Sequence, residues 1–226
     1  MTEAAEIIRE IASDRKRGAT ALAERALDAL AASRRTADEL AAVRPGMPLI
    51  AAVVRRALKR GVAEARRELR SSQRRLVRAS REVLPVAARY IVFGESGTVE
   101  AVLRAVRAKV VRTLPADVGL VGADALLPGG DFVNAKGTGE FLRRVRRRGR
   151  CGVFAVASEL KRVMKAPELE RGFEVVPGRL VHAVLTEKGL VYPPMGVFPT
   201  AEPSWLDRGA LDVEGGRGHC HPHHKR

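Results

Sequence analysis

The stretch that decides the fold runs from Val118 to Arg148 and reads VGLVGADALLPGGDFVNAKGTGEFLRRVRRR. Residues 118–122 form a short apolar run with the length and composition of a buried parallel strand. Asp124 follows where that strand should end, and residues 128–130 (Pro-Gly-Gly) predict a turn. Residues 138–148 have a helical pattern, with apolar side chains on one side and arginines on the other. This order of strand, loop and helix predicts an α/β fold.

A glycine-rich segment, residues 134–139, leads into the predicted helix. The first N–H groups of a helix lack partners within it and lie at its positive end, which suits a phosphate. Ligands of open α/β sheets bind beyond the carboxyl ends of the strands, where Asp124 should also lie. The candidate phosphate-binding residues of this segment are Asn134, Lys136, Gly137 and Thr138.

Composition indicates a globular protein. The chain has 226 residues, of which 46% are hydrophobic, so it can bury a core. It contains no run of about 18 apolar residues, so we expect no membrane-spanning helix. Its acidic, amphipathic start is unlike a signal peptide, and two cysteines, Cys151 and Cys220, are too few for a disulfide framework. We therefore expect a cytoplasmic protein without membrane contact.

The net charge of +15 favours an anionic partner, which includes nucleic acid, the ribosome and phosphorylated ligands. The strongest concentration is residues 55–81, with ten arginines and one lysine against two glutamates. This face either contacts RNA or the ribosome, with strong salt dependence, or is a solvated helix surface. An arginine-rich overall composition is the alternative explanation of the charge. The aromatic content of 4% argues against a base-stacking surface.

The periodicity divides the chain into three predicted parts. Residues 1–86 read as a helical N-terminal domain, with two helices in 3–33 and a long helical stretch in 49–83 that breaks near Gly61. Residues 87–195 read as a Rossmann-like α/β domain, with a mostly parallel sheet and flanking helices. Residues 196–226 read as a loose tail. No cofactor is expected.

The end of the tail gathers side chains of the types that bind metals. They are His219, Cys220, His221, His223 and His224. Zinc, nickel and copper prefer such ligands, but a structural site needs a second ligand cluster, which the sequence lacks. We therefore expect only weak, adventitious metal binding here.

Several motifs resemble one superfamily in the right order: GAD at 122–124, GG at 129–130, Asn134, and GT at 137–138. This superfamily holds the regulatory alpha, beta and delta subunits of translation initiation factor 2B, and isomerases of methylthioribose 1-phosphate and ribose 1,5-bisphosphate. The resemblance covers residues 10–35 and 89–191. The family usually reads NK, one apolar residue and GT, so the lysine here is displaced by one place, to Lys136.

The resemblance implies further ligand contacts. In the isomerases a segment matching Arg17, Gly18 and Ala19 reaches over the substrate and helps hold a phosphate. The loop matching Gly94, Glu95, Ser96, Gly97 and Thr98 touches the ligand, and a lysine matching Lys161 points to the ligand side. The plainer alternatives are a helix–helix turn with a solvated arginine, and a solvated lysine. Residues 173–191 match a region that helps form a dimer, which implies a homodimer.

Two departures from the family bear on function. Gly94 stands where the isomerases have a cysteine that works with the aspartate matching Asp124, and two strand–helix units are absent between residues 109 and 117. The resemblance therefore implies a non-catalytic regulatory protein that binds a phosphorylated small molecule, a translation-related partner, or both. One alternative is a sugar-phosphate aldose–ketose isomerase with Asp124 as acid/base. The other is an RNA- or ribosome-binding protein that uses residues 55–81.

Overall fold

The computed structural model describes residues 2–148 and 151–192. The predicted tail and its weak metal ligands, His219, Cys220, His221, His223 and His224, lie outside the described residues. Within the described part, no helix is long and apolar enough to cross a membrane.

The first third of the chain is helical, as predicted. It contains α1 (Glu3–Ser13), α2 (Ala19–Ala32), η1 (Arg34–Thr36), α3 (Ala37–Ala42), α4 (Pro48–Arg60) and α5 (Val62–Val83). Gly61 separates α4 from α5 with a φ of 90°, a conformation that glycine adopts without a steric cost. The predicted break is therefore confirmed. Leu58 lies before this break and is 40% exposed.

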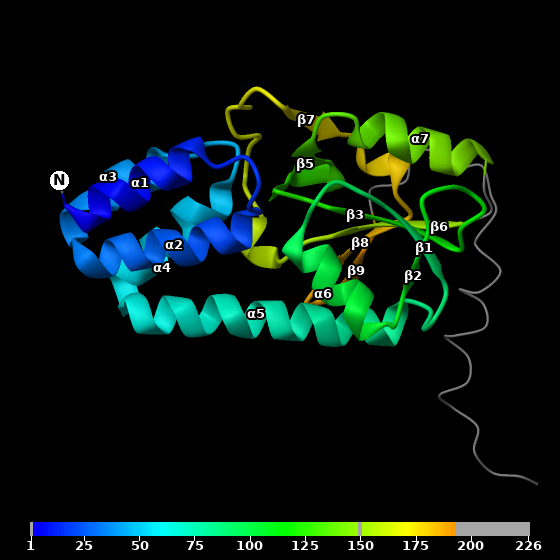
Figure 1. Ribbon diagram of the computed structural model, residues 1–226, viewed down its shortest axis with the longest axis horizontal. Helices are drawn as coiled ribbons and strands as arrows, with labels where there is room; N and C mark the ends of the chain where they lie inside the picture. The colour runs from blue at the N-terminus through cyan, green and yellow to red at the C-terminus, as the bar shows by residue number, and fades with distance from the viewer. Residues whose placement is uncertain (1, 149–150, 193–226) are drawn as a thin grey trace, which may run out of the picture.

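The predicted mostly parallel sheet with flanking helices is confirmed. Its strands are β1 (Arg89–Phe93), β2 (Lys109–Val110), β3 (Val118–Gly122), β6 (Gly152–Val156), β8 (Ala183–Thr186) and β9 (Gly189–Val191). Their order is β2-β1-β3-β6-β8-β9, and every neighbouring pair is parallel except β8 and β9. The helices α6 (Gly97–Ala105) and α7 (Thr138–Arg148) lie on opposite faces (Figure 1).

A second, antiparallel sheet lies beside the first. It consists of β4 (Ala125–Leu126), β5 (Phe132–Ala135) and β7 (Phe173–Val176), in that order, and the short helices η2 (Pro128–Gly130), η3 (Glu159–Lys161) and η4 (Gly178–Leu180) complete the fold. The prediction of a loop over 134–139 is therefore partly wrong, since Asn134 and Ala135 belong to β5. Asn134 pairs in register with Glu174, a long-range contact that local sequence does not reveal.

Helix α5 joins two hydrophobic cores. Its first half contributes Ala65 and Leu69 to a core among the N-terminal helices. Its second half contributes Leu76 to the core that covers one face of the main sheet, together with Val102 of α6. Figure 1 shows α5 running beneath both parts of the molecule. The helical region is thus packed on the sheet, and the proposed boundary at residues 86/87 follows the end of this shared helix.

Candidate functional site

The strand order reverses between β1 and β3, because α6 leads from β1 to β2 on one side and α7 leads from β3 towards β6 on the other. Open α/β sheets bind ligands at such a point, beyond the carboxyl ends of the strands. The loops that follow β1 and β3 touch there. A Cβ atom added at Gly122 would lie 3.0 Å from Ser96 Oγ, so glycine is needed for this close approach.

Two predicted ligand-binding segments line one groove at this point. Arg17 and Gly18, at the start of α2, lie opposite residues 95–98, and together with Lys16, Thr20, Ala21 and Glu100 they enclose about 230 Å³. Gly94 precedes the lining residues with a φ of 75°. Ala19 does not line the groove, because it is buried in the core of the N-terminal helices. Positive and negative side chains both line the groove: Lys16 and Arg17 from the segment before α2, and Glu95 and Glu100 from the loop and first turn of α6.

The first turn of α6 lines this groove with polar groups. Ser96 caps the helix, since its Oγ accepts a hydrogen bond from the Val99 N–H at 3.4 Å. Gly97 and Thr98 begin the helix, where backbone N–H groups have no partner within the helix and the helix dipole is positive. Thr98 is buried, and its Oγ1 lies 3.4 Å from Gln73 Oε1 of α5. This turn is suited to a small anion.

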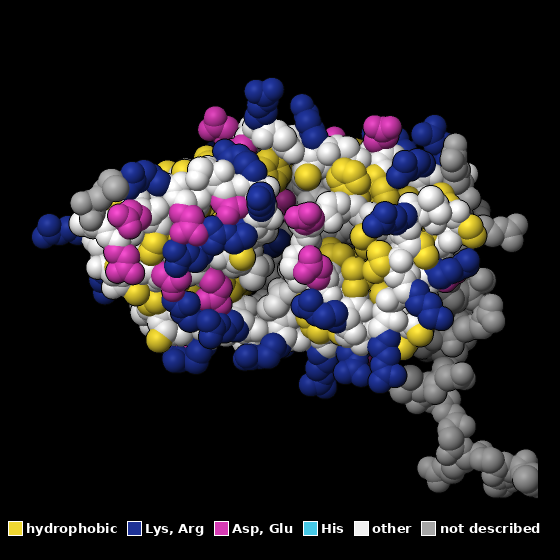
Figure 2. Space-filling view, in the orientation of Figure 1, with side chains coloured by type: hydrophobic (Ala, Val, Ile, Leu, Met, Phe, Trp, Pro, Cys, Tyr) yellow, Lys and Arg dark blue, Asp and Glu magenta, His cyan; other side chains and the backbone are white. Residues whose placement is uncertain are grey.

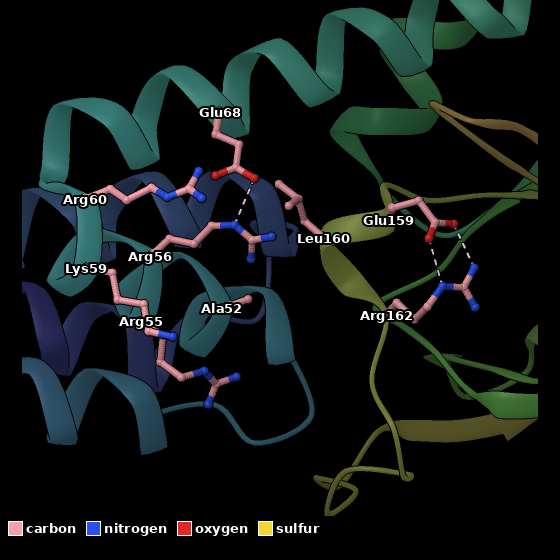
Figure 3. A pocket seen from close by; sticks show the side chains of 9 residues that line it. All are labelled: Ala52, Arg55, Arg56, Lys59, Arg60, Glu68, Glu159, Leu160 and Arg162. Carbon is pink, nitrogen blue, oxygen red and sulfur yellow. Dashed lines mark hydrogen bonds and ion pairs between the residues drawn. The ribbon is translucent and has the colours of Figure 1, made fainter.

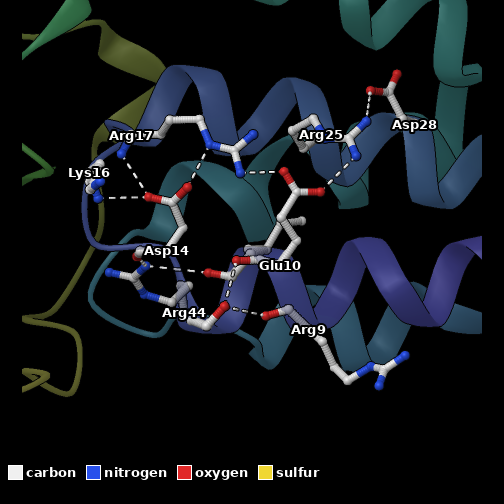
Figure 4. A network of polar contacts seen from close by, with 10 residues as sticks. Arg9, Glu10, Asp14, Lys16, Arg17, Arg25, Asp28 and Arg44 are labelled. Carbon is white, nitrogen blue, oxygen red and sulfur yellow. Dashed lines mark hydrogen bonds and ion pairs between the residues drawn. The ribbon is translucent and has the colours of Figure 1, made fainter.

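Asp14 shapes the segment that carries Arg17, and sequence reasoning missed it. Its Oδ1 accepts the backbone N–H groups of Lys16 and Arg17, each at 2.7 Å, and its Oδ2 accepts Arg17 Nε at 2.6 Å (Figure 4). These bonds lower the pKa of Asp14 to about 2, and the bond from the Arg17 backbone N–H has the largest effect. Glu10 also pairs with Arg17. The sequence does contain a signal for this contact, because Asp14 precedes Arg17 by three residues just before the start of α2.

We expect Asp14→Ala to lower the free energy of unfolding by about 2 kcal/mol at pH 7, because the carboxylate is stabilised in the fold by about two pKa units. The folded pKa lies below the ordinary 3.8, so this stability is present above pH 4 and is lost as the pH falls towards 2. Urea unfolding at several pH values measures it. Asp38→Ala, at an exposed position on α3, is the control and should change stability by less than about 0.5 kcal/mol. A pH-independent loss at Asp14 would contradict this account.

Asp124 and Lys161 interact with each other but do not line the groove, and Asp124 is half-buried whereas Lys161 is buried. Lys161 is 4% exposed, and its Nζ donates to the carbonyl of Ala123 at 2.6 Å. The alternative of a solvated lysine is therefore wrong. Burial lowers the pKa of Lys161, and the negative charge of Asp124 opposes this shift only in part. Burial raises the pKa of Asp124, and Lys161 and then Arg44 oppose this shift.

Arg44 and Glu170 are two further charged residues of this region that sequence reasoning missed. The Arg44 side chain is 2% exposed and pairs with Glu170 at 2.7 Å, and its Nη1 donates to the carbonyl of Asp14 at 2.7 Å. Glu170 Oε1 also accepts the Gly46 N–H, at 3.3 Å. The pair fastens the turn between α1 and α2 to the segment before β7. Because its members are 126 residues apart, no local pattern could indicate it.

The predicted phosphate site at the start of α7 is largely occupied by the protein itself. Glu174 of β7 accepts the Gly139 N–H at 2.8 Å, so a carboxylate already lies at the positive end of this helix. Asn134 donates to Thr138 Oγ1 at 3.0 Å, and both side chains are buried. The Lys136 side chain is exposed. Gly137 packs closely against the end of β1, since a Cβ atom added to it would lie 3.0 Å from the Phe93 ring, and it does not line the groove.

The remaining candidates are structural. Cys151 is the free cysteine of the described residues, and it is buried just before β6, at the amino end of the strand rather than beside Asp124. His182 accepts the Val153 N–H on Nδ1 at 2.9 Å, and burial lowers its pKa. Within residues 2–148 and 151–192, no group of His, Cys, Asp and Glu side chains is arranged to hold a metal ion.

The basic stretch 55–81 is divided by the fold. Five of its arginines pair with acidic side chains: Arg56, Arg66, Arg67, Arg70 and Arg78. Figure 2 shows acidic and basic side chains interleaved over α1 and α2, whereas basic side chains predominate along the lower edge, where α5 lies. Ion pairs thus offset part of the positive charge of this stretch. Among the described residues, its cations without an acidic partner are Arg55, Lys59, Arg60, Arg74, Arg75 and Arg81.

Comparison with solved structures identifies the fold. The chain aligns with translation initiation factor eIF-2B from Pyrococcus horikoshii OT3 at a TM-score of 0.72 and 20% identity, over 86% of this chain and 98% of that one. It aligns with 5-methylthioribose 1-phosphate isomerase from the same organism at 0.63 and 17%, over 85% of each chain. A tetrameric eIF2B-beta2-delta2 complex from C. thermophilum aligns at 0.65 and 14%, over 83% and 90%.

At these identities the comparison shows a shared fold. No protein-family model matches the sequence, and neither does any curated protein. The fold that the predicted resemblance implies is therefore confirmed by the three-dimensional structure.

Proposed function

We propose that this chain, which has the fold shared by the eIF-2B and methylthioribose-1-phosphate isomerase structures, is a non-catalytic regulatory protein that binds a phosphorylated small molecule. The observation that carries the proposal is the groove at the strand-order reversal, where Arg17 and Gly18 meet the first turn of α6. Its volume of about 230 Å³ suits a compact ligand rather than a polymer.

The regulatory alternative is favoured over catalysis by the surroundings of Asp124. Isomerisation of an opened sugar moves a hydrogen between adjacent carbons and needs a placed acid and base. Gly94 offers no side chain at the place that the resemblance assigns to the second group, and Cys151 lies at the other end of the sheet. Binding without turnover requires only the phosphate contacts of Arg17 and of the α6 start.

We expect a thermal-shift screen to identify a sugar phosphate that raises the melting temperature. The screen contains ribose 1,5-bisphosphate, methylthioribose 1-phosphate and nucleoside monophosphates. A ligand at a hundred times its dissociation constant adds about 2.7 kcal/mol of stability, which a melt detects. Arg17→Gln should abolish the shift, because it removes the only guanidinium among the groove residues.

Arg81→Gln is the matched control, since it removes one exposed arginine at the far end of α5. It should leave the shift unchanged. If no sugar phosphate or nucleotide shifts the melt, the proposal fails. If Arg17→Gln and Arg81→Gln weaken the shift equally, binding reflects overall charge and the groove is not the site.

Catalysis as a sugar-phosphate isomerase is the second candidate, and the raised pKa of Asp124 favours it. A buried carboxyl with a raised pKa is better able to act as an acid near neutral pH. The ligand found in the screen should therefore be tested for turnover with the wild type and with Asp124→Asn. Turnover that Asp124→Asn abolishes would establish the isomerase and overturn the regulatory proposal.

Macromolecular partners remain part of the proposal. We also propose a translation-related protein partner and a homodimer, and the shared fold is the support for both. The mass of the purified protein in solution tests the dimer, and a monomer at all concentrations would refute it. RNA or ribosome binding depends on the unpaired cations of residues 55–81, and RNA retention that does not fall with salt would contradict it.

A further inference from the structure

A second cleft lies between α4 and η3, separate from the groove at the starts of α2 and α6. It encloses about 500 Å³. Its lining residues are Ala52, Arg55, Arg56, Lys59, Arg60, Glu68, Glu159, Leu160 and Arg162. Figure 3 shows the side chains of α4 on one side and those of η3 with Arg162 on the other. Five cationic side chains and two acidic ones therefore share one hollow.

Both acidic side chains of the cleft are already paired. Glu68 accepts Arg56 Nε at 2.9 Å, and Glu159 accepts Arg162 through both carboxylate oxygens, at 2.7 and 2.8 Å. Arg55, Lys59 and Arg60 have no acidic partner within residues 2–148 and 151–192. The cleft thus holds three positive charges that have no acidic partner among these residues.

These cations repel one another. Arg55 and Lys59 lie four residues apart on α4, as do Arg56 and Arg60, and like charges at this spacing face each other on a helix. The negative end of the α4 dipole compensates Lys59 and Arg60, which lie in its last turn, but Arg55 lies one turn earlier. An anion bound between them would remove the repulsion.

The lining restricts the kind of anion. No aromatic side chain lines the cleft, so a base has nothing to stack on. A volume of about 500 Å³ has the size of a small-molecule site, and several converging cations match several phosphates rather than one. The geometry points to a compact polyphosphate, and we propose that the cleft binds a triphosphate group, free or as part of a nucleotide.

The site is distinct from the groove of the proposed function, and it does not rest on that function. The cleft and the groove share no lining residue, and Asp124 lines neither of them. Asp124→Asn should therefore leave triphosphate binding unchanged. A sugar phosphate bound in the groove should not compete with triphosphate.

Isothermal titration of the full chain with inorganic tripolyphosphate tests the inference. We expect saturable binding that is at least tenfold tighter than that of inorganic phosphate and weakens with salt. Arg55→Gln/Lys59→Gln should weaken it at least tenfold. Arg78→Gln/Arg81→Gln removes the same charge from the exposed end of α5 and should change it less than twofold. All four positions are exposed, and a thermal melt of each variant verifies that it folds.

Two further arms distinguish the sources of the triphosphate. ATP should bind about as tightly as tripolyphosphate and adenosine should not bind, because the cleft recognises only the phosphates. Absence of saturable tripolyphosphate binding overturns the inference, and so does equal weakening by the two double variants. Binding of single-stranded RNA without binding of tripolyphosphate also overturns it and assigns the cleft to a nucleic acid.

Discussion

Replacing Arg44 with methionine is expected to lower the free energy of unfolding by about 3 kcal/mol, because it leaves Glu170 without its cation in a largely buried position. The Arg44 side chain is 2% exposed and that of Glu170 is 20% exposed, so water compensates little. The substitution also removes the donor to the carbonyl of Asp14. Urea unfolding at pH 7 measures the loss.

Arg78→Met is the matched control for Arg44→Met. Arg78 lies 3.7 Å from Glu82, with both side chains more than two-thirds exposed, and such surface pairs contribute at most about 1 kcal/mol. Similar losses for the two variants would show that the Arg44–Glu170 pair has no special role. Because the pair fastens the Arg17 turn, Arg44→Met should also weaken ligand binding in the groove.

Replacing Lys161 with methionine is expected to cost about 3 kcal/mol at pH 8 and clearly less at pH 5. The substitution removes the cation that most opposes the raised pKa of the buried Asp124, so the charged carboxylate is left without its main compensation. The folded pKa of Asp124 already lies above its ordinary 3.8 and should rise further. Protonation removes the buried charge, so the penalty falls as the pH falls through the folded pKa.

A double variant isolates this coupling. Asp124→Asn/Lys161→Met has no buried carboxylate to compensate, so it should be more stable at pH 8 than Lys161→Met alone. Lys165→Met, at an exposed position four residues later, should change stability by less than about 0.5 kcal/mol. If Lys161→Met loses the same stability at pH 5 and pH 8, the lysine acts only through its bond to the carbonyl of Ala123.

Part of the candidate site was predictable because its signals are local. A strand that ends at Asp124 and a capped helix after Ser96 can be recognised from apolar runs and turn residues, and strand ends in parallel sheets gather at one edge. The contacts of Asp14 are also local, since its carboxylate binds the backbone two and three residues later. In contrast, the assignment of Asn134 to a loop failed, because its strand depends on pairing with Glu174.

The sequence by itself determined the helical first third, the break at Gly61 and the mostly parallel sheet, since these follow from periodicity and from backbone preferences over a few residues. Only the tertiary structure decided which charges remain available. It pairs Arg44 with Glu170, fills the start of α7 with Glu174 and buries Lys161 beside Asp124. It also leaves Arg55 and Lys59 unpaired in the described part of the chain. Charge compensation depends on distances between side chains far apart in sequence, and only folding sets those distances.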